Sequence, residues 1–168
     1  SLLRFAKPAS PRLAVTLLAP LLSETVDGLK ATLPEAADVT VSSELDATAE
    51  AACDPLLLAT AVDNLVRNAV EAAAAARDMG RTTDPQVTVK LTMADRTAAI
   101  TVEDNAGDLA SEAEARLFEP FATSKSKGIG LGLSMARRAV EDQGGVLRFE
   151  RGQRGLRFII ELPCGVQT

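Results

Sequence analysis

The stretch DNAGDLASEAEARLFEPFATSKSKGIGLGL, from Asp104 to Leu133, decides which fold the rest of the chain is expected to adopt. It begins with an acid at the end of a strand-like run and ends in three glycines that open a helix, Gly128, Gly130 and Gly132. Glycine at alternate positions lets backbone N–H groups approach a ligand without a side-chain collision. The first turn of the following helix adds unpaired N–H groups and a partial positive charge. The pattern favours a phosphate site, although such a turn also occurs where it serves only packing.

Two lysines, Lys125 and Lys127, lie directly upstream of these glycines. The connection that carries them, from Asp104 to Gly128, is too long to be a simple joint, and we expect it to form a lid over a ligand. The spacing excludes two common phosphate sites. The chain has no GxxxxGK[ST] motif of a P-loop, and its GxG does not follow a strand at the start of a βαβ unit, as a Rossmann fold requires.

The composition indicates one aliphatic domain with an acidic balance. The 168 residues suit a single domain, and 46% hydrophobic but only 3% aromatic residues predict a core of Leu, Val, Ile and Ala. The net charge of −5 argues against a nucleic-acid-binding face. The absence of histidine removes histidine-based catalysis, histidine metal sites and a histidine phosphoacceptor from this chain. Cys53 and Cys164 are too few for a disulfide framework, and we expect thiols in a reducing compartment.

Hydrophobic periodicity and turn residues predict an α/β (α+β) two-layer sandwich. Asp54 and Pro55 form a helix start, with a capping acid before a proline at the first helical position, and Gly80 ends that helix. The order of elements suits a mixed, mostly antiparallel sheet with helices packed on one face. The expected helices are Leu17–Leu33, Asp54–Met79 and Gly132–Gln143, and the expected strands are Arg12–Thr16, Asp38–Leu45, Gln86–Met93, Thr97–Glu103, Val146–Glu150 and Leu156–Leu162, with Asp46–Cys53 ambiguous.

The long helix carries a pair of amides that share one face. Asn64 and Asn68 are four residues apart, and Glu71 follows three residues later. One interpretation is that the amides only cap neighbouring backbone groups, as buried amides need partners. The functional interpretation is a Mg²⁺ site in which Asn68 offers its amide oxygen, while waters and phosphate oxygens complete the shell.

Asp104 follows the strand Thr97–Glu103 and has two possible roles. It could simply begin the loop as an Asx turn. Alternatively, its carboxylate could accept a hydrogen bond from the exocyclic amine of adenine and so disfavour guanine, which places a carbonyl there. Phe118 and Phe121 are two of only five phenylalanines in the chain, and we expect them to anchor the lid.

Four motifs follow one another along the chain: Asn64-Leu65-x-x-Asn68-Ala69, then DNAGDL, then FEPFATSK, then GIGLGL. In this order and spacing they resemble the N box, the first glycine box, the F box and the second glycine box of the catalytic ATP-binding domain of bacterial sensor histidine kinases. This family shares a superfamily with DNA gyrase, the MutL ATPases and a cytosolic chaperone. The opening LLRFAKP resembles the exit from the family's dimerisation helices, so the match covers nearly the whole chain. The resemblance implies a Bergerat-type fold that binds ATP and Mg²⁺.

The resemblance also implies roles for the matching residues. Asn68 would be the metal ligand and would act in catalysis together with Asn64 and Lys125, with Glu71 nearby. Asp104 would read adenine, and Gly107 would shape the loop beside it. Arg67 would either reach phosphate or remain a solvated helix charge. The other nucleotide contacts that the resemblance implies are Lys125, Lys127, Gly128, Gly130, Leu131, Gly132 and Leu133.

Three features separate this chain from the family pattern or from its hydrolytic relatives. Asp108 stands where the family usually has a second glycine, and aspartate tolerates a left-handed turn but brings a carboxylate near the nucleotide. The phosphate-accepting histidine would lie on a dimerisation helix upstream of this sequence. Where the ATPase relatives carry a glutamate as general base, this chain has Asn64, which accepts no proton at neutral pH. The site is therefore expected to transfer phosphate to a presented nucleophile by positioning and Mg²⁺.

Together with these features, the resemblance implies a protein histidine kinase fragment that does not autophosphorylate alone. We expect this domain to be cytoplasmic, an expectation that leaves open a membrane anchor in the parent protein. Residues 1–11 are expected to form a linker and the end of a dimerisation helix, and residues 12–168 the catalytic domain. The expected partners are the parent's own histidine-bearing dimerisation domain and a cognate response regulator, in a homodimeric parent, with no nucleic acid and no membrane contact by this domain. Two alternatives remain open: a degenerate, non-catalytic module that docks a partner such as a response regulator, and a serine kinase of the anti-sigma type.

Overall fold

The structure is a computed structural model, and it describes residues 10–107 and 132–164 of the chain. Its main layer is a five-stranded sheet in the order β2-β4-β5-β7-β6, in which β2 pairs with β4 in parallel and the other neighbours are antiparallel. This arrangement confirms the expected mixed, mostly antiparallel sheet. The strands are β2 (Thr40–Leu45), β4 (Gln86–Ala94), β5 (Thr97–Asp104), β6 (Val146–Arg151) and β7 (Leu156–Pro163).

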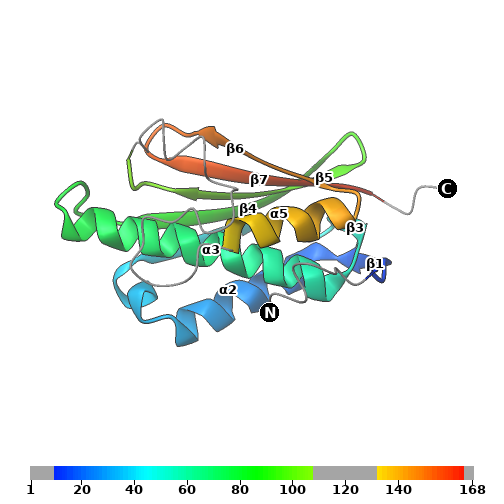
Figure 1. Cartoon of the computed structure of the whole chain (residues 1–168), viewed down its shortest axis with the longest axis horizontal. Coiled ribbons are helices and arrows are strands. Elements are labelled where there is room, and N and C mark those ends of the chain that lie inside the picture. The colour runs from blue at the N-terminus through cyan, green and yellow to red at the C-terminus, as the bar shows by residue number, and fades with distance from the viewer. Residues whose placement is uncertain (1–9, 108–131, 165–168) are drawn as a thin grey trace.

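The helices form the second layer and lie on one face of this sheet (Figure 1). They are α2 (Leu18–Thr32), α3 (Pro55–Asp78) and α5 (Gly132–Asp142). The alternation of buried and half-buried residues along β5 shows why the sheet packs against the helices. Ala98, Ile100 and Val102 are fully buried on the helix-covered side, while the residues between them are only half-buried. Among the described residues, the hydrophobic core is aliphatic apart from Phe158 and Cys53, as the low aromatic content predicts. The expected two-layer sandwich is confirmed.

The long helix α3 begins and ends at the predicted residues. The Oδ1 atom of Asp54 accepts hydrogen bonds from the backbone N–H groups of Leu56 (3.1 Å) and Leu57 (3.2 Å), and Pro55 occupies the first helical position. After the last turn, Gly80 adopts a φ of 74°, a left-handed conformation that stops the helix at low cost for a glycine. The register of α3, and with it the face that carries its amides, is therefore set by local sequence signals.

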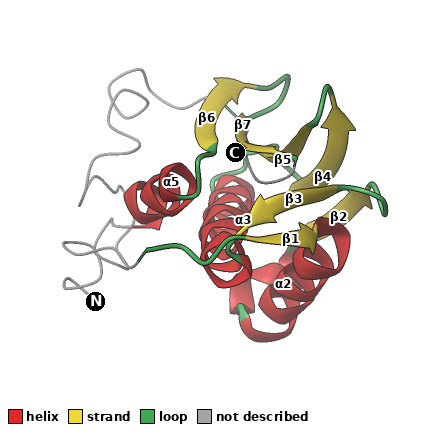
Figure 2. Ribbon diagram, turned by 90° about the vertical axis from the view of Figure 1, so that its right-hand side faces the viewer, coloured by secondary structure: helices red, strands yellow, loops and turns green. Residues whose placement is uncertain are grey.

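Two features near the N-terminus differ from the expectation. A second, two-stranded sheet pairs β1 (Ala14–Leu17) with β3 (Glu50–Cys53) in antiparallel register, and β3 lies in the segment that was ambiguous in the sequence. The strand expected from Asp38 begins instead at Thr40, because Pro34–Asp38 forms a 3₁₀ turn in which Val39 N–H donates to the carbonyl of Ala36. Figure 2 shows the small sheet beside α2 and α3.

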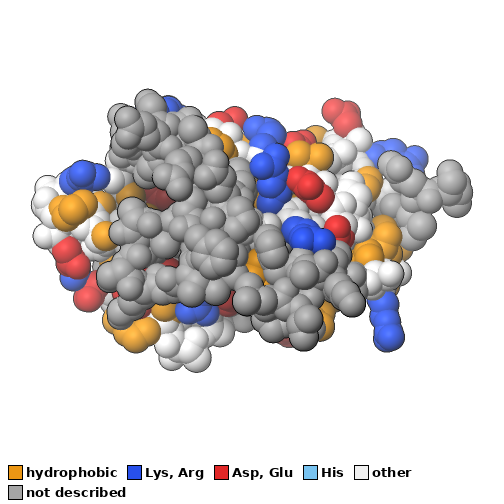
Figure 3. Space-filling view, in the orientation of Figure 1, with side chains coloured by type: hydrophobic (Ala, Val, Ile, Leu, Met, Phe, Trp, Pro, Cys, Tyr) orange, Lys and Arg blue, Asp and Glu red, His pale blue; other side chains and the backbone are white. Residues whose placement is uncertain are grey.

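The open face of the main sheet is covered by ion pairs. Arg157 contacts Glu103 at 2.9 Å and Glu150 at 2.7 Å, and Arg148 contacts Glu150 at 3.2 Å and Glu161 at 2.9 Å. Such half-exposed pairs contribute little stability individually, but they keep this face hydrophilic. In the view of Figure 3, the side chains that are not grey include acidic and basic groups interspersed with hydrophobic ones. A ligand that needs apolar walls would therefore bind on the helix-covered side.

Both cysteines are free thiols. Cys53 is fully buried, and this burial raises the pKa of its thiol above the ordinary value, so the thiol stays protonated and unreactive. Within the two described segments, no helix combines the length and the apolar character that a membrane crossing requires.

Candidate functional site

The two amides of α3 lie against the first residue of α5. A Cβ atom placed on Gly132 would sit 3.7 Å from the Nδ2 atom of Asn68 and 4.0 Å from the Oδ1 atom of Asn64. Both asparagines are half-buried, and the fully buried Leu65 between them faces the core. The structure thus brings the end of the glycine-rich stretch and the Asn64–Asn68 face together.

The first turn of α5 provides backbone donors beside these amides. The helix begins at Gly132, and its first N–H groups have no acceptor within the helix because no earlier turn exists. Leu133 packs against the core, which fixes the orientation of this turn. A glycine at position 132 keeps the space between α5 and the asparagines free of a side chain. The arrangement is suited to an anion held next to an amide oxygen.

The neighbouring charges on α3 differ in their surroundings. Arg67 pairs with Asp63 one turn earlier at 3.3 Å, and the side chains of the two are 43% and 37% exposed. This contact favours the interpretation of Arg67 as a solvated helix charge, because reaching a ligand would require the pair to separate. Glu71 is half-buried one turn beyond Asn68, on the face that the sequence predicted.

Asp104 is the last residue of β5 and lies on the helix-covered side, continuing the alternation of Ala98, Ile100 and Val102. Only 6% of it is exposed. Its Oδ1 atom accepts hydrogen bonds from the N–H groups of Ala106 (2.9 Å) and Leu156 (3.4 Å). The first bond is the Asx turn considered above. A carboxylate has about four lone-pair positions, so the turn and the recognition of a ligand donor are compatible.

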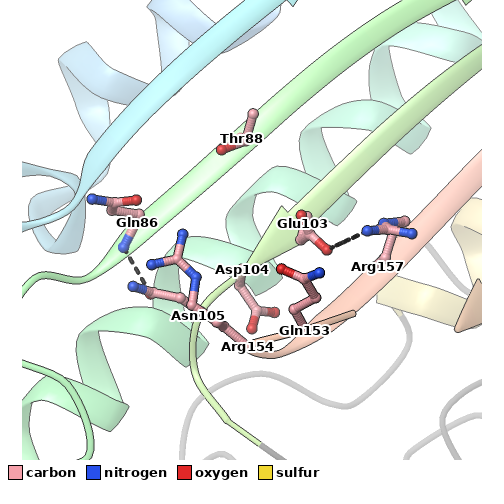
Figure 4. A pocket seen from close by; sticks show the side chains of 8 residues that line it. All are labelled: Gln86, Thr88, Glu103, Asp104, Asn105, Gln153, Arg154 and Arg157. Atoms are coloured by element: carbon pink, nitrogen blue, oxygen red, sulfur yellow. Dashed lines mark hydrogen bonds and ion pairs between the residues drawn. The ribbon is translucent and has the colours of Figure 1, made fainter. Parts of the chain in front are cut away.

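The loop after Asp104 is anchored on two sides by contacts that the sequence did not predict. Asn105 accepts from the N–H of Gln86 (2.8 Å) and donates from Nδ2 to the carbonyl of Asp84 (2.7 Å), which ties the loop to the start of β4 (Figure 4). Gly107 has a φ of 90° and donates its N–H to the carbonyl of Arg154 at 2.8 Å. The predicted loop glycine therefore adopts a left-handed conformation that favours glycine.

The hollow in Figure 4 adjoins the candidate site at Asp104. Its lining includes Thr88, Glu103 and Arg157 as well as Asp104 itself, and it holds about 100 Å³. Ligand pockets usually hold roughly 300–1,000 Å³. The hollow is therefore too small to hold a nucleotide by itself.

Several predicted positions lie outside the described residues. They are the expected lid and phosphate-loop residues Lys125, Lys127, Gly128, Gly130 and Leu131, together with Asp108, Phe118, Phe121 and most of the expected linker over residues 1–11.

The described residues fit a magnesium ion held jointly with a phosphate. No group of three His, Cys, Asp or Glu side chains within residues 10–107 and 132–164 could hold a metal by itself. Mg²⁺ usually takes one or two protein oxygen ligands and completes its shell with waters and phosphate oxygens. The side-chain amide of Asn68, whose Nδ2 atom lies nearest Gly132, would meet that requirement through its oxygen.

The chain matches a known family over most of its length. Residues 53–166 match the model of the histidine kinase-, DNA gyrase B- and HSP90-like ATPases. This range contains Asn64, Asn68, Asp104 and Gly132.

Curated relatives and solved structures agree with this family match. The chain is 37% identical over 99 residues to the C4-dicarboxylate transport sensor protein DctB of Rhizobium meliloti, an alignment that covers 59% of this chain and 15% of that protein. It is 33% identical over 163 residues to the C4-dicarboxylate transport sensor protein DctS of Rhodobacter capsulatus, covering 95% of this chain and 24% of that protein. The chain thus spans less than a quarter of the length of these relatives.

The fold is shared with the catalytic domain of histidine kinase ThkA, which superposes with a TM-score of 0.76 at 23% identity and covers 90% of this chain and 95% of that one. Full-length ShkA in complex with AMPPNP superposes with a TM-score of 0.78 at 22% identity over 99% of this chain and 35% of that one. The family match and the fold agree with the motifs: the chain belongs to the histidine kinase-, DNA gyrase B- and HSP90-like ATPase family, and within it to the ATP-binding domains of sensor histidine kinases.

Proposed function

We propose that this domain binds ATP with Mg²⁺ and transfers the γ-phosphoryl group to a histidine on a dimerisation domain of the same parent protein. The observation that carries the proposal is the contact between the Asn64–Asn68 face of α3 and Gly132 at the start of α5. This contact supports the proposal because it sets two side-chain amides, each with an oxygen that could bind a metal, beside backbone donors for a phosphate. Family membership supplies ATP as the nucleotide.

Asp104 would recognise the adenine. Its nearly buried carboxylate accepts from backbone donors, so it is held in place before a ligand arrives. A further hydrogen bond from the exocyclic amine of adenine would be charge-assisted, and guanine would place a carbonyl oxygen against the same group. Gly107, with its left-handed backbone, leaves the loop beside the base without a side chain.

Asn68 would hold the metal at the other end of the nucleotide, beside the first turn of α5. The ion would supply neutralisation of the charge on the phosphate oxygens. Gly132 and Leu133 would contribute backbone N–H groups at this end. We include Lys125, Lys127, Gly128, Gly130 and Leu131 in the proposal as the remaining phosphate and lid contacts, on the strength of their motif alone.

Asn64 supports transfer over hydrolysis. An amide accepts no proton at neutral pH, so this position cannot activate a water as a general base. The reaction would instead break the bond between the γ-phosphorus and the β–γ bridging oxygen and form a bond to a histidine nitrogen presented in line. Because the chain contains no histidine, the acceptor must be on another domain.

The partners follow from the same reasoning. ThkA in complex with the response regulator TrrA superposes with a TM-score of 0.77 at 22% identity, over 98% of this chain and 45% of that one. This neighbour supports a cognate response regulator as a second partner of the parent protein, which we propose is a homodimer with its catalytic domains in the cytoplasm. The alternative, a non-catalytic docking module, is favoured by Asp108, whose carboxylate replaces the usual glycine.

Thermal unfolding with nucleotides tests binding. A ligand at a hundredfold excess over its Kd stabilises the folded state by about 2.7 kcal/mol. For 168 residues this corresponds to a rise in Tm of roughly 5–10 °C. We expect ATP and ADP with Mg²⁺ to raise the Tm and GTP to raise it much less. An unchanged Tm at millimolar ATP would contradict the proposal and support the docking module.

Phosphate transfer is tested with radiolabelled ATP. The isolated chain should remain unlabelled, while the dimerisation domain of the same parent, added in trans, should become labelled on histidine. Rapid release of phosphate by the isolated chain would show that the hydrolytic members of the family are the better model.

A further inference from the structure

The turn between β6 and β7 closes over Asp104. The turn, Gly152 to Gly155, is closed by a hydrogen bond of 2.7 Å from the N–H of Gly152 to the carbonyl of Gly155. We propose that this turn is a positioning element for purine selectivity: Gly155 and the backbone of Leu156 hold the carboxylate of Asp104 in the orientation that distinguishes adenine from guanine. The inference rests on the nucleotide site proposed above and adds residues that no motif of that site contains.

Gly155 allows the turn to touch the acid directly. A Cβ atom at this position would lie closer than 3 Å to three atoms of Asp104, its Oδ1, its carbonyl oxygen and its carbonyl carbon, the last at 2.9 Å. Two of these atoms belong to the backbone, which cannot turn aside as a flexible side chain would. Any larger residue at position 155 must therefore displace β5, the turn or the carboxylate itself.

The turn also supplies a donor to the carboxylate. Leu156 N–H donates to Oδ1 of Asp104 at 3.4 Å, and Ala106 N–H donates to the same oxygen at 2.9 Å. Next to these bonds, Gly107 N–H donates to the carbonyl of Arg154 at 2.8 Å, so the turn and the loop after β5 are joined as well. Backbone N–H groups from the loop after β5 and from the first residue of β7 thus converge on one oxygen.

The register of the sheet keeps this arrangement in place. Glu103 pairs with Arg157 across β5 and β7, and their side chains form hydrogen bonds of 2.9 and 3.1 Å on the open face. The same register sets Asp104 opposite Leu156 on the helix-covered face. A positioning group must hold its partner within about 0.5 Å to preserve selectivity, and a rigid strand pair does so better than a loop.

Gly152 and Gly145 offer matched controls. A Cβ atom on Gly152 would meet the carboxylate end of Glu103, which can move aside at the cost of its bonds to Arg157, and would lie 3.3 Å from the carbonyl oxygen of Gly155; its three nearest atoms include none of Asp104. A Cβ atom on Gly145 would lie 2.7 Å from Leu162 Cδ2 and 2.8 Å from the carbonyl oxygen of Glu161, away from Asp104. Gly152→Ala therefore changes the same turn without touching Asp104, and Gly145→Ala strains the fold elsewhere.

The experiment measures Kd for ATP and for GTP by calorimetry in the wild type and in the three variants, with urea unfolding of each. We expect Gly155→Ala to lower the ratio of Kd(GTP) to Kd(ATP) by about tenfold, the loss of one well-placed hydrogen bond. Gly152→Ala should keep the ratio within about twofold, as expected for a change away from the reading group. Gly145→Ala should lose stability and keep the ratio.

A second substitution removes the donor alone. Replacing Leu156 by its α-hydroxy acid exchanges the backbone N–H for an ester oxygen and adds no atom that could collide. We expect this ester variant also to lower the ratio of Kd(GTP) to Kd(ATP). If Gly155→Ala does not fold, the ester variant alone tests the inference. An unchanged ratio in a folded Gly155→Ala protein, or in the ester if only that folds, would overturn the inference. A wild type that does not bind ATP would instead refute the proposed function.

Discussion

Asp54 links the start of α3, the helix that carries the proposed metal ligand, to the segment before β1. Its replacement should therefore change the stability of the domain measurably. Its Oδ1 atom accepts from Leu56 and Leu57 N–H, at 3.1 and 3.2 Å, and its Oδ2 atom accepts from Arg12 N–H at 2.9 Å. Asp54→Ala removes all three bonds. Asp54→Asn keeps an oxygen for the helix cap but replaces the second oxygen with a donor, so the bond from Arg12 is lost.

The magnitude follows from these contacts. Loss of an N-cap costs about 1 kcal/mol, and loss of a hydrogen bond costs roughly another 1 kcal/mol. We therefore expect Asp54→Ala to lower the free energy of unfolding by about 2 kcal/mol and Asp54→Asn by about half of that. For a chain of 168 residues, 2 kcal/mol corresponds to a fall in Tm of roughly 4–8 °C.

The pH dependence of this stability has a defined sign. The bond from Arg12 N–H, with smaller contributions from Leu57 N–H, Leu56 N–H and the charge of Arg12, outweighs partial burial and holds the pKa of Asp54 below its ordinary value of 3.8. A depressed pKa stabilises the folded state above the unfolded-state value, and this stabilisation is lost as pH falls through the folded-state value. The difference between wild type and Asp54→Asn should therefore be constant from pH 7 to 5 and shrink below about pH 4.

Urea unfolding at pH 7, 5 and 3, followed by circular dichroism, measures these differences in the free energy of unfolding. The comparison requires the same dependence on urea concentration, the slope m, in each variant. If Asp54→Ala matches the wild type at pH 7, the cap contributes nothing and the reasoning fails. If the difference between wild type and Asp54→Asn is the same at pH 3 as at pH 7, the charge of Asp54 is not what stabilises the contact with Arg12.

Two further predictions concern the site. Asn68→Ala should abolish Mg²⁺-dependent ATP binding in calorimetry without unfolding the domain, because its half-buried amide would serve the ion under the proposal and lies outside the fully buried core. Arg67→Ala is the control on the same helix. Unfolding with unchanged affinity would show that the amide is structural. Asp104→Asn should weaken ATP binding by about 10- to 100-fold, the loss of one charge-assisted hydrogen bond, and should remove the preference over GTP, since an amide N–H can donate to the guanine carbonyl. Competition between the two nucleotides measures this, and an unchanged preference would exclude Asp104 from base recognition.

The parts of the fold that the sequence predicts are those with local signals. Asp54, Pro55 and Gly80 determine the bounds of α3 through caps within a few residues of each other. The β4–β5 hairpin was also predicted from its short turn, where Asp95 and Arg96 have φ values of 50° and 61°. The pairing of β1 with β3 was not predicted, because the segment Glu50–Cys53 is short and does not alternate between polar and apolar residues. Its last three residues are all buried. Only a partner distant in sequence makes this segment a strand.

The candidate site likewise contains residues that local sequence motifs predict and residues that only the pairing of distant strands brings in. The motifs identify Asn68, Asp104 and Gly132 as residue types, but the role that we assign to Gly155 depends on the register between β5 and β7. Leu156 lies 52 positions beyond Asp104, and no spacing rule joins them. The turn glycines were visible in the sequence only as the bend of a hairpin. A prediction of the register, from the charge pair Glu103 and Arg157 on facing strands, is the signal that could have located this contact.

The geometry at the phosphate end is set by contacts far from it. Gln143, just beyond α5, is 3% exposed; its Oε1 accepts from Asp54 N–H at 2.7 Å and its Nε2 donates to the carbonyl of Ala139 at 2.9 Å. This amide joins the end of α5 to the start of α3. Because both helices are rigid, fixing them there also fixes how Gly132, at the other end of α5, faces Asn68. The proposed metal ligand and phosphate donors are thus oriented by the packed core before a nucleotide binds, which would reduce the ordering that binding requires.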